Sequence, residues 1–292
     1  MPSTPDRADH RFAAAATLGE GPIWHAGTLW FVDIEANTLS RLDGDERAIF
    51  DAGQRIGFAV PTARGDWIVG LQHGLARWTP GQNQPAVFHD PEPDRPDNRF
   101  NDGKADPAGR LFAGTLKMPC DQPVASLYRI NHDCSTDTIA TGLTISNGLA
   151  WDARRRAMYH TDTPTQRITR YDWDPATSAA TNPRTLIELD PSLGSPDGMT
   201  IDTAGRLYVA MWGGGRVLVI DPTTASVAAA IAVDAPHVTS CCFGGPDLDT
   251  LYITSARIGL TDEQLAAHPR SGDIFAAAIG LRGLPADTFI DA

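Results

Sequence analysis

The chain lacks the features that mark several classes of protein. Its longest apolar runs reach about eight residues, as between Ile274 and Leu281, whereas a membrane-spanning helix needs about 18 or more. Its 24 Lys and Arg are outnumbered by 36 Asp and Glu, giving a net charge of −12, while nucleic-acid binding relies on clustered basic residues. The first ten residues hold no apolar segment, so we expect no secretory signal there. We expect a cytoplasmic protein that binds neither membranes nor nucleic acid.

Cysteine is also scarce. The four cysteines form no Cys-x-x-Cys pair and stand at Cys120, Cys134, Cys241 and Cys242. Reduced thiols are usual in cytosolic proteins, so we expect reduced, buried cysteines. A disulfide between Cys120 and Cys134 is the alternative.

Glycine and proline, by contrast, are abundant. The 27 glycines and 22 prolines make up about one residue in six, against an average near ~12%. Both residue types destabilise helices and favour turns, which argues against a helical bundle or coiled coil. A chain of 292 residues fits one large all-β domain, because propellers and barrels often reach this length as a single unit.

A short apolar strand pattern recurs six times along the chain. The copies are 38 to 50 residues apart, each follows a turn, and they begin at Leu29, Trp67, Leu111, Ala157, Leu207 and Leu251. This period is typical of a β-propeller. We therefore predict an all-β fold, a six-bladed β-propeller with blades of four antiparallel strands around a central metal-binding channel. It would form one domain over residues 1–292, with residues 1–10 as a flexible tail. We expect residues 12–16 to close the ring beside residues 273–279, leaving no free sheet edge.

Polar residues occupy one phase of this repeat. Glu20 lies nine residues before its recurrent strand, and three further residues lie ten before theirs, namely Asn101, Asn147 and Asp197. The same phase holds Gly57 in repeat 2 and Cys241 in repeat 6. The first strand of a propeller blade lines the central channel, so the four polar side chains are predicted to converge there. Taken singly, Asx-Gly pairs are ordinary turn formers, but four in register favour a site.

Carboxylate and amide oxygens of this kind suit a divalent cation. Ca²⁺, Mg²⁺ and Mn²⁺ are the expected ions, with Zn²⁺ and Fe²⁺ as alternatives. Two carboxylates and two amides leave coordination positions open to water or substrate, which is typical of a catalytic rather than a structural metal.

The segments around these residues carry a family resemblance. They read Leu18-Gly-Glu20-Gly-Pro-Ile-Trp24, Arg99-Phe-Asn101-Asp-Gly-Lys104, Ser146-Asn147-Gly148-Leu and Ser195-Pro-Asp197-Gly198-Met. In this order, from about Ala16 to Ala278, they resemble the SMP-30/gluconolactonase/regucalcin family, and its bacterial sugar lactonases in particular. The resemblance implies a six-bladed propeller that hydrolyses sugar lactones with a divalent metal.

The same resemblance implies roles for individual residues. Glu20, Asn147 and Asp197 match the metal ligands, and Asp197 also matches the residue that acts as base or proton shuttle. Arg99 and Asn101 match residues that contact the substrate. Residues 117–121 depart from the animal members, which carry an acidic pair where this chain reads Lys-Met-Pro-Cys-Asp.

The sequence thus predicts an enzyme, a sugar lactonase that hydrolyses an aldonolactone such as glucono-, xylono- or arabinonolactone. Its partner would be the small-molecule lactone, and the protein a monomer or weak dimer. A non-enzymatic, regucalcin-like propeller that binds Ca²⁺ or a ligand is one alternative. A paraoxonase-like esterase is another, although it predicts a more apolar pocket mouth than we expect here. Serine-nucleophile and zincin hydrolases are not expected, because the chain has no Gly-x-Ser-x-Gly and no His-Glu-x-x-His.

Overall fold

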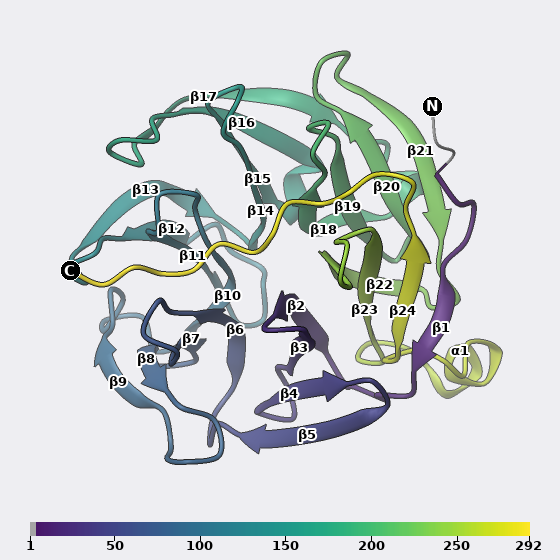
Figure 1. The fold of residues 1–292 in the computed structure, drawn as a ribbon, viewed down its shortest axis with the longest axis horizontal. Helices are drawn as coiled ribbons and strands as arrows, with labels where there is room; N and C mark the ends of the chain where they lie inside the picture. Colours follow the sequence, from purple (N-terminus) through teal and green to yellow (C-terminus); the bar gives the residue numbers. More distant parts are fainter. Residues whose placement is uncertain (1–3) are drawn as a thin grey trace.

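The computed structural model describes residues 4–292. Within them, 24 strands form six four-stranded antiparallel sheets arranged around a central axis, which confirms the six-bladed β-propeller (Figure 1). The second strand of every blade coincides with one copy of the recurrent sequence pattern.

The first three blades are each continuous in sequence. Blade 1 consists of β2 (Gly19–His25), β3 (Thr28–Asp33), β4 (Thr38–Asp43) and β5 (Glu46–Asp51). Blade 2 consists of β6 (Ile56–Pro61), β7 (Trp67–Leu71), β8 (Gly74–Trp78) and β9 (Ala86–His89). Blade 3 consists of β10 (Asn98–Ala105), β11 (Leu111–Lys117), β12 (Ala125–Ile130) and β13 (Thr136–Leu143).

The last three blades complete the ring. Blade 4 consists of β14 (Ser146–Asp152), β15 (Ala157–Asp162), β16 (Arg167–Trp173) and β17 (Ala180–Glu188). Blade 5 consists of β18 (Ser195–Ile201), β19 (Leu207–Trp212), β20 (Arg216–Asp221) and β21 (Ser226–Ala232). Blade 6 joins both ends of the chain through β22 (His237–Gly244), β23 (Thr250–Ala256), β24 (Ile274–Ala278) and β1 (Asp9–Phe12). Short helices lie in the connections: η1 (Thr163–Thr165), η2 (Pro191–Leu193) and α1 (Asp262–Ala267). None of the helices in the described part of the chain has the length and apolarity that crossing a membrane requires.

The ring closes a few residues earlier than the sequence predicted. Strand β1 pairs with β24 through Asp9 opposite Ala276 and Phe12 opposite Ile274, so the closing strand is 9–12 rather than 12–16. The chain leaves the sheet after Phe12, and Ala15 has a φ of 49° that an extended strand does not adopt. The predicted tail at residues 1–10 is corrected in the same way, because its last two residues belong to β1. Residues 1–3 lie outside the described part.

The first strand in sequence of each blade is the innermost one. Strands β2, β6, β10, β14, β18 and β22 contact one another in this order around the ring, and β22 returns to β2. As predicted, these strands line the central channel. Every one of them carries a β-bulge, where pairing with the second strand skips one or two residues.

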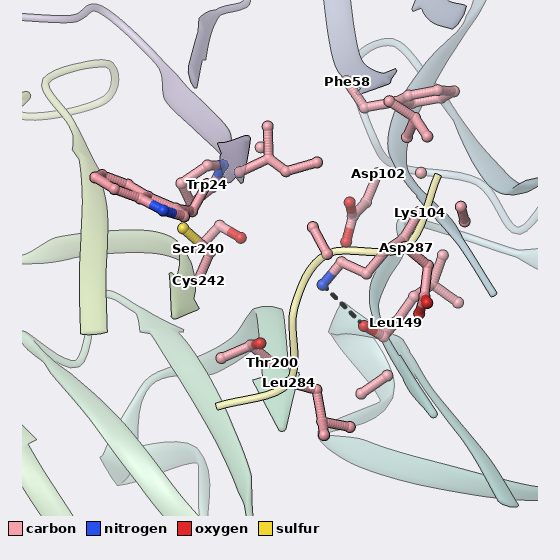
Figure 2. Close-up of a pocket in the computed structure, with 18 of the residues that line it drawn as sticks. Trp24, Phe58, Asp102, Lys104, Leu149, Thr200, Ser240, Cys242, Leu284 and Asp287 are labelled. Atoms are coloured by element: carbon pink, nitrogen blue, oxygen red, sulfur yellow. Dashed lines mark hydrogen bonds between the residues drawn. The ribbon is translucent and has the colours of Figure 1, made fainter. Parts of the chain in front are cut away.

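The C-terminal segment closes one end of the channel. After β24 the chain crosses the face of the ring, as the yellow trace in Figure 1 shows. It is held by bridges from Gly283 to Asp202 and from Phe289 to Thr62. Beneath it lies a small cavity of about 80 Å³, lined among others by Asp102, Lys104 and Asp287 (Figure 2).

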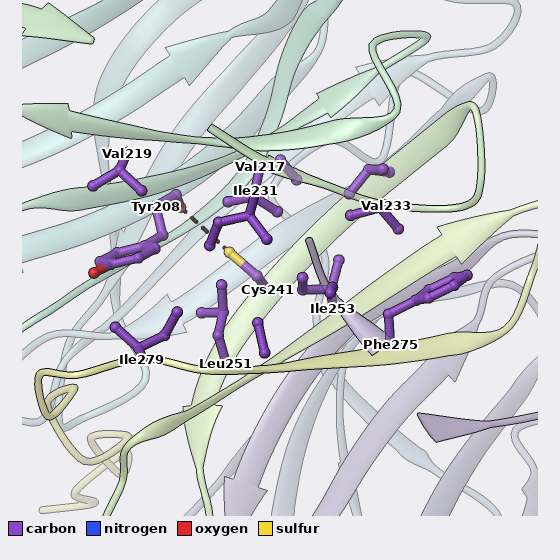
Figure 3. Close-up of a cluster of buried hydrophobic side chains, with 14 of the residues drawn as sticks. Tyr208, Val217, Val219, Ile231, Val233, Cys241, Leu251, Ile253, Phe275 and Ile279 are labelled. Carbon is purple, nitrogen blue, oxygen red and sulfur yellow. Dashed lines mark hydrogen bonds between the residues drawn. The ribbon is translucent and has the colours of Figure 1, made fainter. Parts of the chain in front are cut away.

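Apolar side chains of neighbouring blades pack against each other and form the core. Between blades 5 and 6, Val219 and Ile231 share a fully buried cluster with Leu251 and Ile253 (Figure 3). Cys241 belongs to this cluster, and its Sγ donates to the carbonyl of Tyr208 at 3.3 Å. The side chain of Cys241, which was expected to face the channel, therefore packs between blades 5 and 6.

The turn between β22 and β23 explains why Cys241 leaves the expected position. Leu251 pairs with Phe243, eight positions earlier. Leu207 in blade 5 pairs with Ile201, six positions earlier, so the longer turn of blade 6 places Cys241 nearer the turn end of its inner strand. All four cysteines are free thiols, so the alternative Cys120–Cys134 disulfide is absent from the structure.

Candidate functional site

The five residues predicted for the site line one cavity at the end of the channel. The cavity has a volume of about 460 Å³. Glu20 comes from β2, Arg99 and Asn101 from β10, Asn147 from β14 and Asp197 from β18. Four inner strands that are far apart in sequence thus bring these side chains together.

The local structure of each inner strand directs these side chains. Bulges follow Glu20 and Asn147 directly, and another contains Asp197. A bulge re-aims a side chain relative to the sheet, which is why such features recur next to functional sites. The adjacent glycines make room for the close approach of neighbouring strands. A Cβ on Gly148 would lie 2.6 Å from the carbonyl oxygen of Asp197, and one on Gly198 would lie 2.1 Å from Ser240 Oγ.

Three carboxyl groups influence one another along the channel: Glu20 and Asp197 line this cavity, and Asp102 lines the smaller cavity beneath the C-terminal segment. Burial is the main cause that raises the pKa of Glu20, and the charge of Asp102 raises it further. Burial also raises the pKa of Asp197 well above its ordinary value, with Glu20 and Asp102 adding to the effect. Asp102 has a raised pKa from burial, which the charge of Lys104 opposes. Without a further cation, these surroundings therefore disfavour the ionised form of all three groups.

Asn147 is oriented by hydrogen bonds. Its Nδ2 donates to Thr163 Oγ1 at 3.0 Å, and Thr163 Oγ1 donates to the carbonyl of Pro196 at 2.9 Å. Because the amide nitrogen is engaged in this way, the amide oxygen of Asn147 is left to accept from a ligand or coordinate a cation. Asp197 Oδ1 is buried and has no hydrogen-bond partner among the described residues.

These observations fit a divalent cation held by Glu20, Asn147 and Asp197. An unpartnered buried carboxylate oxygen is costly, and so are neighbouring carboxylates that raise each other's pKa. A hard cation relieves both costs with the oxygen donors that it prefers. Within residues 4–292 no group of three or more His, Cys, Asp or Glu is arranged to hold a metal. The fit therefore depends on the amide oxygen of Asn147 as well as on the two carboxylates.

Arg99 and Asn101 form the adjoining part of the cavity floor. Arg99 Nη1 donates to Asn101 Oδ1 and to the carbonyl of Phe100, both at 2.9 Å. Asn101 Nδ2 in turn donates to the carbonyl of Ser146 at 3.0 Å. Arg99 is buried, burial lowers its pKa, and its Nε has no partner in the described structure. These two side chains are thus fixed by the protein itself, and Arg99 retains a donor for a ligand.

No pattern in the sequence predicted the residues of the cavity walls. They are mostly apolar and include Ile34, Leu116, Met118, Ile145, Trp212 and Ile258. The cavity is therefore more apolar than the sequence led us to expect. Trp212 stacks on His237, with ring centroids 3.9 Å apart and planes inclined by 14°. Because the wall residues lie in different blades, no sequence motif could have collected them.

Lys104 connects three inner strands below the cavity. Its Nζ donates to the carbonyl of Leu149 at 3.0 Å (Figure 2). It also donates to the carbonyl of Met199 at 2.7 Å. These carbonyls lie two residues after Asp197 and Asn147. Lys104 on β10 therefore sets the spacing of β14 and β18 next to the candidate metal ligands.

Comparisons with known proteins agree with this architecture. The family description SMP-30/Gluconolactonase/LRE-like region matches residues 18–257. The protein named "Putative sugar lactone lactonase YvrE" from Bacillus subtilis is 40% identical over 273 residues, covering 92% of this chain and 93% of that protein. Regucalcin from Danio rerio is 38% identical over 277 residues, covering 92% and 93%. A solved structure of luciferin-regenerating enzyme superposes with a TM-score of 0.89 at 30% identity, covering 99% of each chain. The chain therefore belongs to the SMP-30/gluconolactonase/LRE-like family.

Proposed function

We propose that this protein is a metal-dependent hydrolase that opens a lactone, with the sugar (aldono) lactones as its first candidate class. The observation that carries the proposal is the convergence of Glu20, Asn147 and Asp197 with Arg99 on the floor of one cavity. A sugar lactone lactonase among the relatives supports the same chemistry.

In this proposal Glu20, Asn147 and Asp197 hold one divalent cation through oxygen atoms. When bound, the cation supplies Lewis acidity toward the lactone carbonyl and lowers the pKa of a coordinated water. Asp197 has a second carboxylate oxygen, so it is placed to accept the proton of the attacking water and to return it to the departing ring oxygen.

Arg99 and Asn101 would position the substrate. The planar guanidinium of Arg99 presents several donors in a fixed arrangement and is already held by Asn101 and the backbone. Its guanidinium lines the cavity, so a donor that is not used by Asn101 or Phe100 could contact a ring or carbonyl oxygen. Prior fixation of both groups reduces the entropy lost when the substrate is oriented.

The test is acid release from a panel of aldono-1,4- and 1,5-lactones by protein with Ca²⁺, Mg²⁺, Mn²⁺ or Zn²⁺, and after treatment with a chelator. We expect hydrolysis that the chelator abolishes and that one of these ions restores. Hydrolysis that persists after complete metal removal would contradict the proposed role of the metal.

A non-enzymatic binding protein is the second candidate, favoured by the relatives named regucalcin. It predicts tight Ca²⁺ binding without turnover of any lactone. Calorimetric titration with Ca²⁺, run beside the hydrolysis assay on the same preparation, separates the two functions.

A further inference from the structure

The upper part of the cavity differs chemically from its floor. The oxygen and guanidinium groups gather on the floor, whereas the walls are formed by apolar side chains. Two of the cavity's apolar lining residues, Met118 and Ile258, remain 37% and 38% exposed and therefore lie where the cavity opens to solvent. An apolar rim around a concave site is typical of a surface that binds an apolar group.

The polar groups among the walls are few, and most of them already have a partner in the protein. Glu35 forms an ion pair with Arg55 at 2.9 Å. Thr163 Oγ1 donates to a backbone carbonyl and accepts from Asn147. Ser195 Oγ accepts from Gln166 Nε2 at 3.0 Å, which leaves its own O–H free to donate. The space above the floor therefore offers fewer hydrogen-bond partners than a polyhydroxylated ligand requires.

This arrangement bears on which lactone the site favours. A sugar lactone carries several hydroxyl groups, and burying a hydroxyl without a partner opposes binding. An alkyl or aromatic group gains from leaving water for the same walls. The cavity of about 460 Å³ lies in the range that accommodates ligands well beyond a bare lactone ring.

Trp212 adds a flat surface to this space. Its ring is fixed by the stacked His237, so little side-chain freedom is lost when a ligand packs against it. An aromatic face held in this way suits an apolar substituent lying over it.

We propose that this site prefers a lactone bearing an apolar substituent, a short alkyl chain or an aromatic ring, over a polyhydroxylated one. The proposal rests on the lactone hydrolysis proposed above, but it replaces the sugar lactones, which the relatives suggest as the first candidates, with a substrate class chosen from the cavity walls. Water adds its oxygen to the acyl carbon, the bond from that carbon to the ring oxygen breaks, and the ring oxygen takes up a proton. The product is a hydroxy acid with its apolar substituent intact.

The test compares kcat/KM of the metal-loaded protein for γ-butyrolactone, its γ-alkyl homologues with one to six carbons, and glucono-1,5-lactone. We expect kcat/KM to rise by about fourfold per methylene until the walls are filled, and to exceed the value for glucono-1,5-lactone. Higher kcat/KM for glucono-1,5-lactone than for every alkyl lactone overturns the inference but leaves lactone hydrolysis intact. Hydrolysis of none of these lactones overturns the proposed function itself.

Substitutions at the exposed apolar residues of the cavity test whether they cause the preference for apolar lactones. Met118→Gln and Ile258→Gln are expected to reduce the gain per methylene to less than twofold, because they place amides where the alkyl chain would lie. Both side chains are substantially exposed, so the substitutions do not threaten the fold. Ile49→Gln is the matched control, since Ile49 is 56% exposed and lies in β5 on the outer edge of blade 1. If the increase in kcat/KM per methylene is the same in both rim variants as in the parent, these walls do not cause the preference and the assignment is refuted.

Discussion

Arg99 Nη1 donates a hydrogen bond to Asn101 Oδ1 at 2.9 Å, two positions along the same inner strand. We propose that both residues contact the substrate, and in the structure they also contact each other. Asn101 is also tied to blade 4 through the carbonyl of Ser146. The pair is thus a preformed unit that connects two blades on the cavity floor.

Replacing Arg99 should impair catalysis more than folding. Arg99→Lys keeps the charge but loses the planar arrangement that serves Asn101, Phe100 and a ligand at once. We expect kcat/KM for the best lactone to fall about 100-fold, the range seen when a positioned donor is removed from an active site. Steady-state kinetics measures the loss, and Arg95→Lys, a change at a half-exposed arginine, serves as the control. A fall in kcat/KM smaller than threefold would show that Arg99 does not position the substrate.

Replacing Asp197 should abolish metal binding and turnover together. Asp197→Ala removes one proposed ligand and the proposed proton acceptor in a single change. We expect the metal content of purified protein, measured by elemental analysis, to drop from about one ion per chain to near zero, with kcat reduced at least 1000-fold. Asp43→Asn, at an exposed residue of β4, should change neither quantity. A variant that keeps its metal and near-normal kcat would disprove the assigned roles.

Lys104 should stabilise the fold below the site. Lys104→Met leaves the carbonyls of Leu149 and Met199 without their donor and Asp102 without its nearby cation. We expect the free energy of unfolding in urea to fall by about 3 kcal/mol. Adding Asp102→Asn to Lys104→Met should recover part of this loss, because the uncompensated charge is then gone. A double variant less stable than the single one would show that the Asp102 charge is not the cause.

His160 should make the protein less stable in mild acid. It is buried beside Ser146, with Oγ to Nε2 at 2.8 Å, and burial lowers its pKa from 6.5 to about 4. Above pH 6.5 neither folded nor unfolded chain protonates this histidine. As the pH falls toward 4 the unfolded chain takes up the proton first, so stability is lost, reaching about 3 kcal/mol at pH 4 and below.

The measurement is the free energy of unfolding in urea at pH 7.5 and pH 4.5, for the parent and for His160→Gln. Other titrating groups contribute equally to both proteins, so the difference between the two pH slopes isolates His160. Equal slopes for the parent and His160→Gln would contradict the prediction.

The repeat and the phase of its polar residues could be predicted from sequence, because both depend on regular spacing. Apolar strand segments recur with the blade period, and strands alternate their side chains regularly, so Glu20, Asn101, Asn147 and Asp197 could be assigned to one level of the channel. The same counting failed for Cys241. The turn between β22 and β23 is longer than the corresponding turn of the other blades, so Leu251 pairs eight positions back with Phe243, and counting ten residues back from Leu251 reaches a position nearer the turn.

The amino-acid sequence by itself determined the propeller, the number of blades and four polar residues of the cavity floor, since these follow from periodic spacing. Arg99 came only from the family resemblance. Only the tertiary structure decided the closing strand, the orientation of Asn147 by Thr163, the anchoring of Lys104 across three strands, and the apolar walls. Each of these depends on side chains from blades that meet only when the ring closes. Contacts between such distant segments leave no spacing or motif in the chain, and they determine what the cavity can hold.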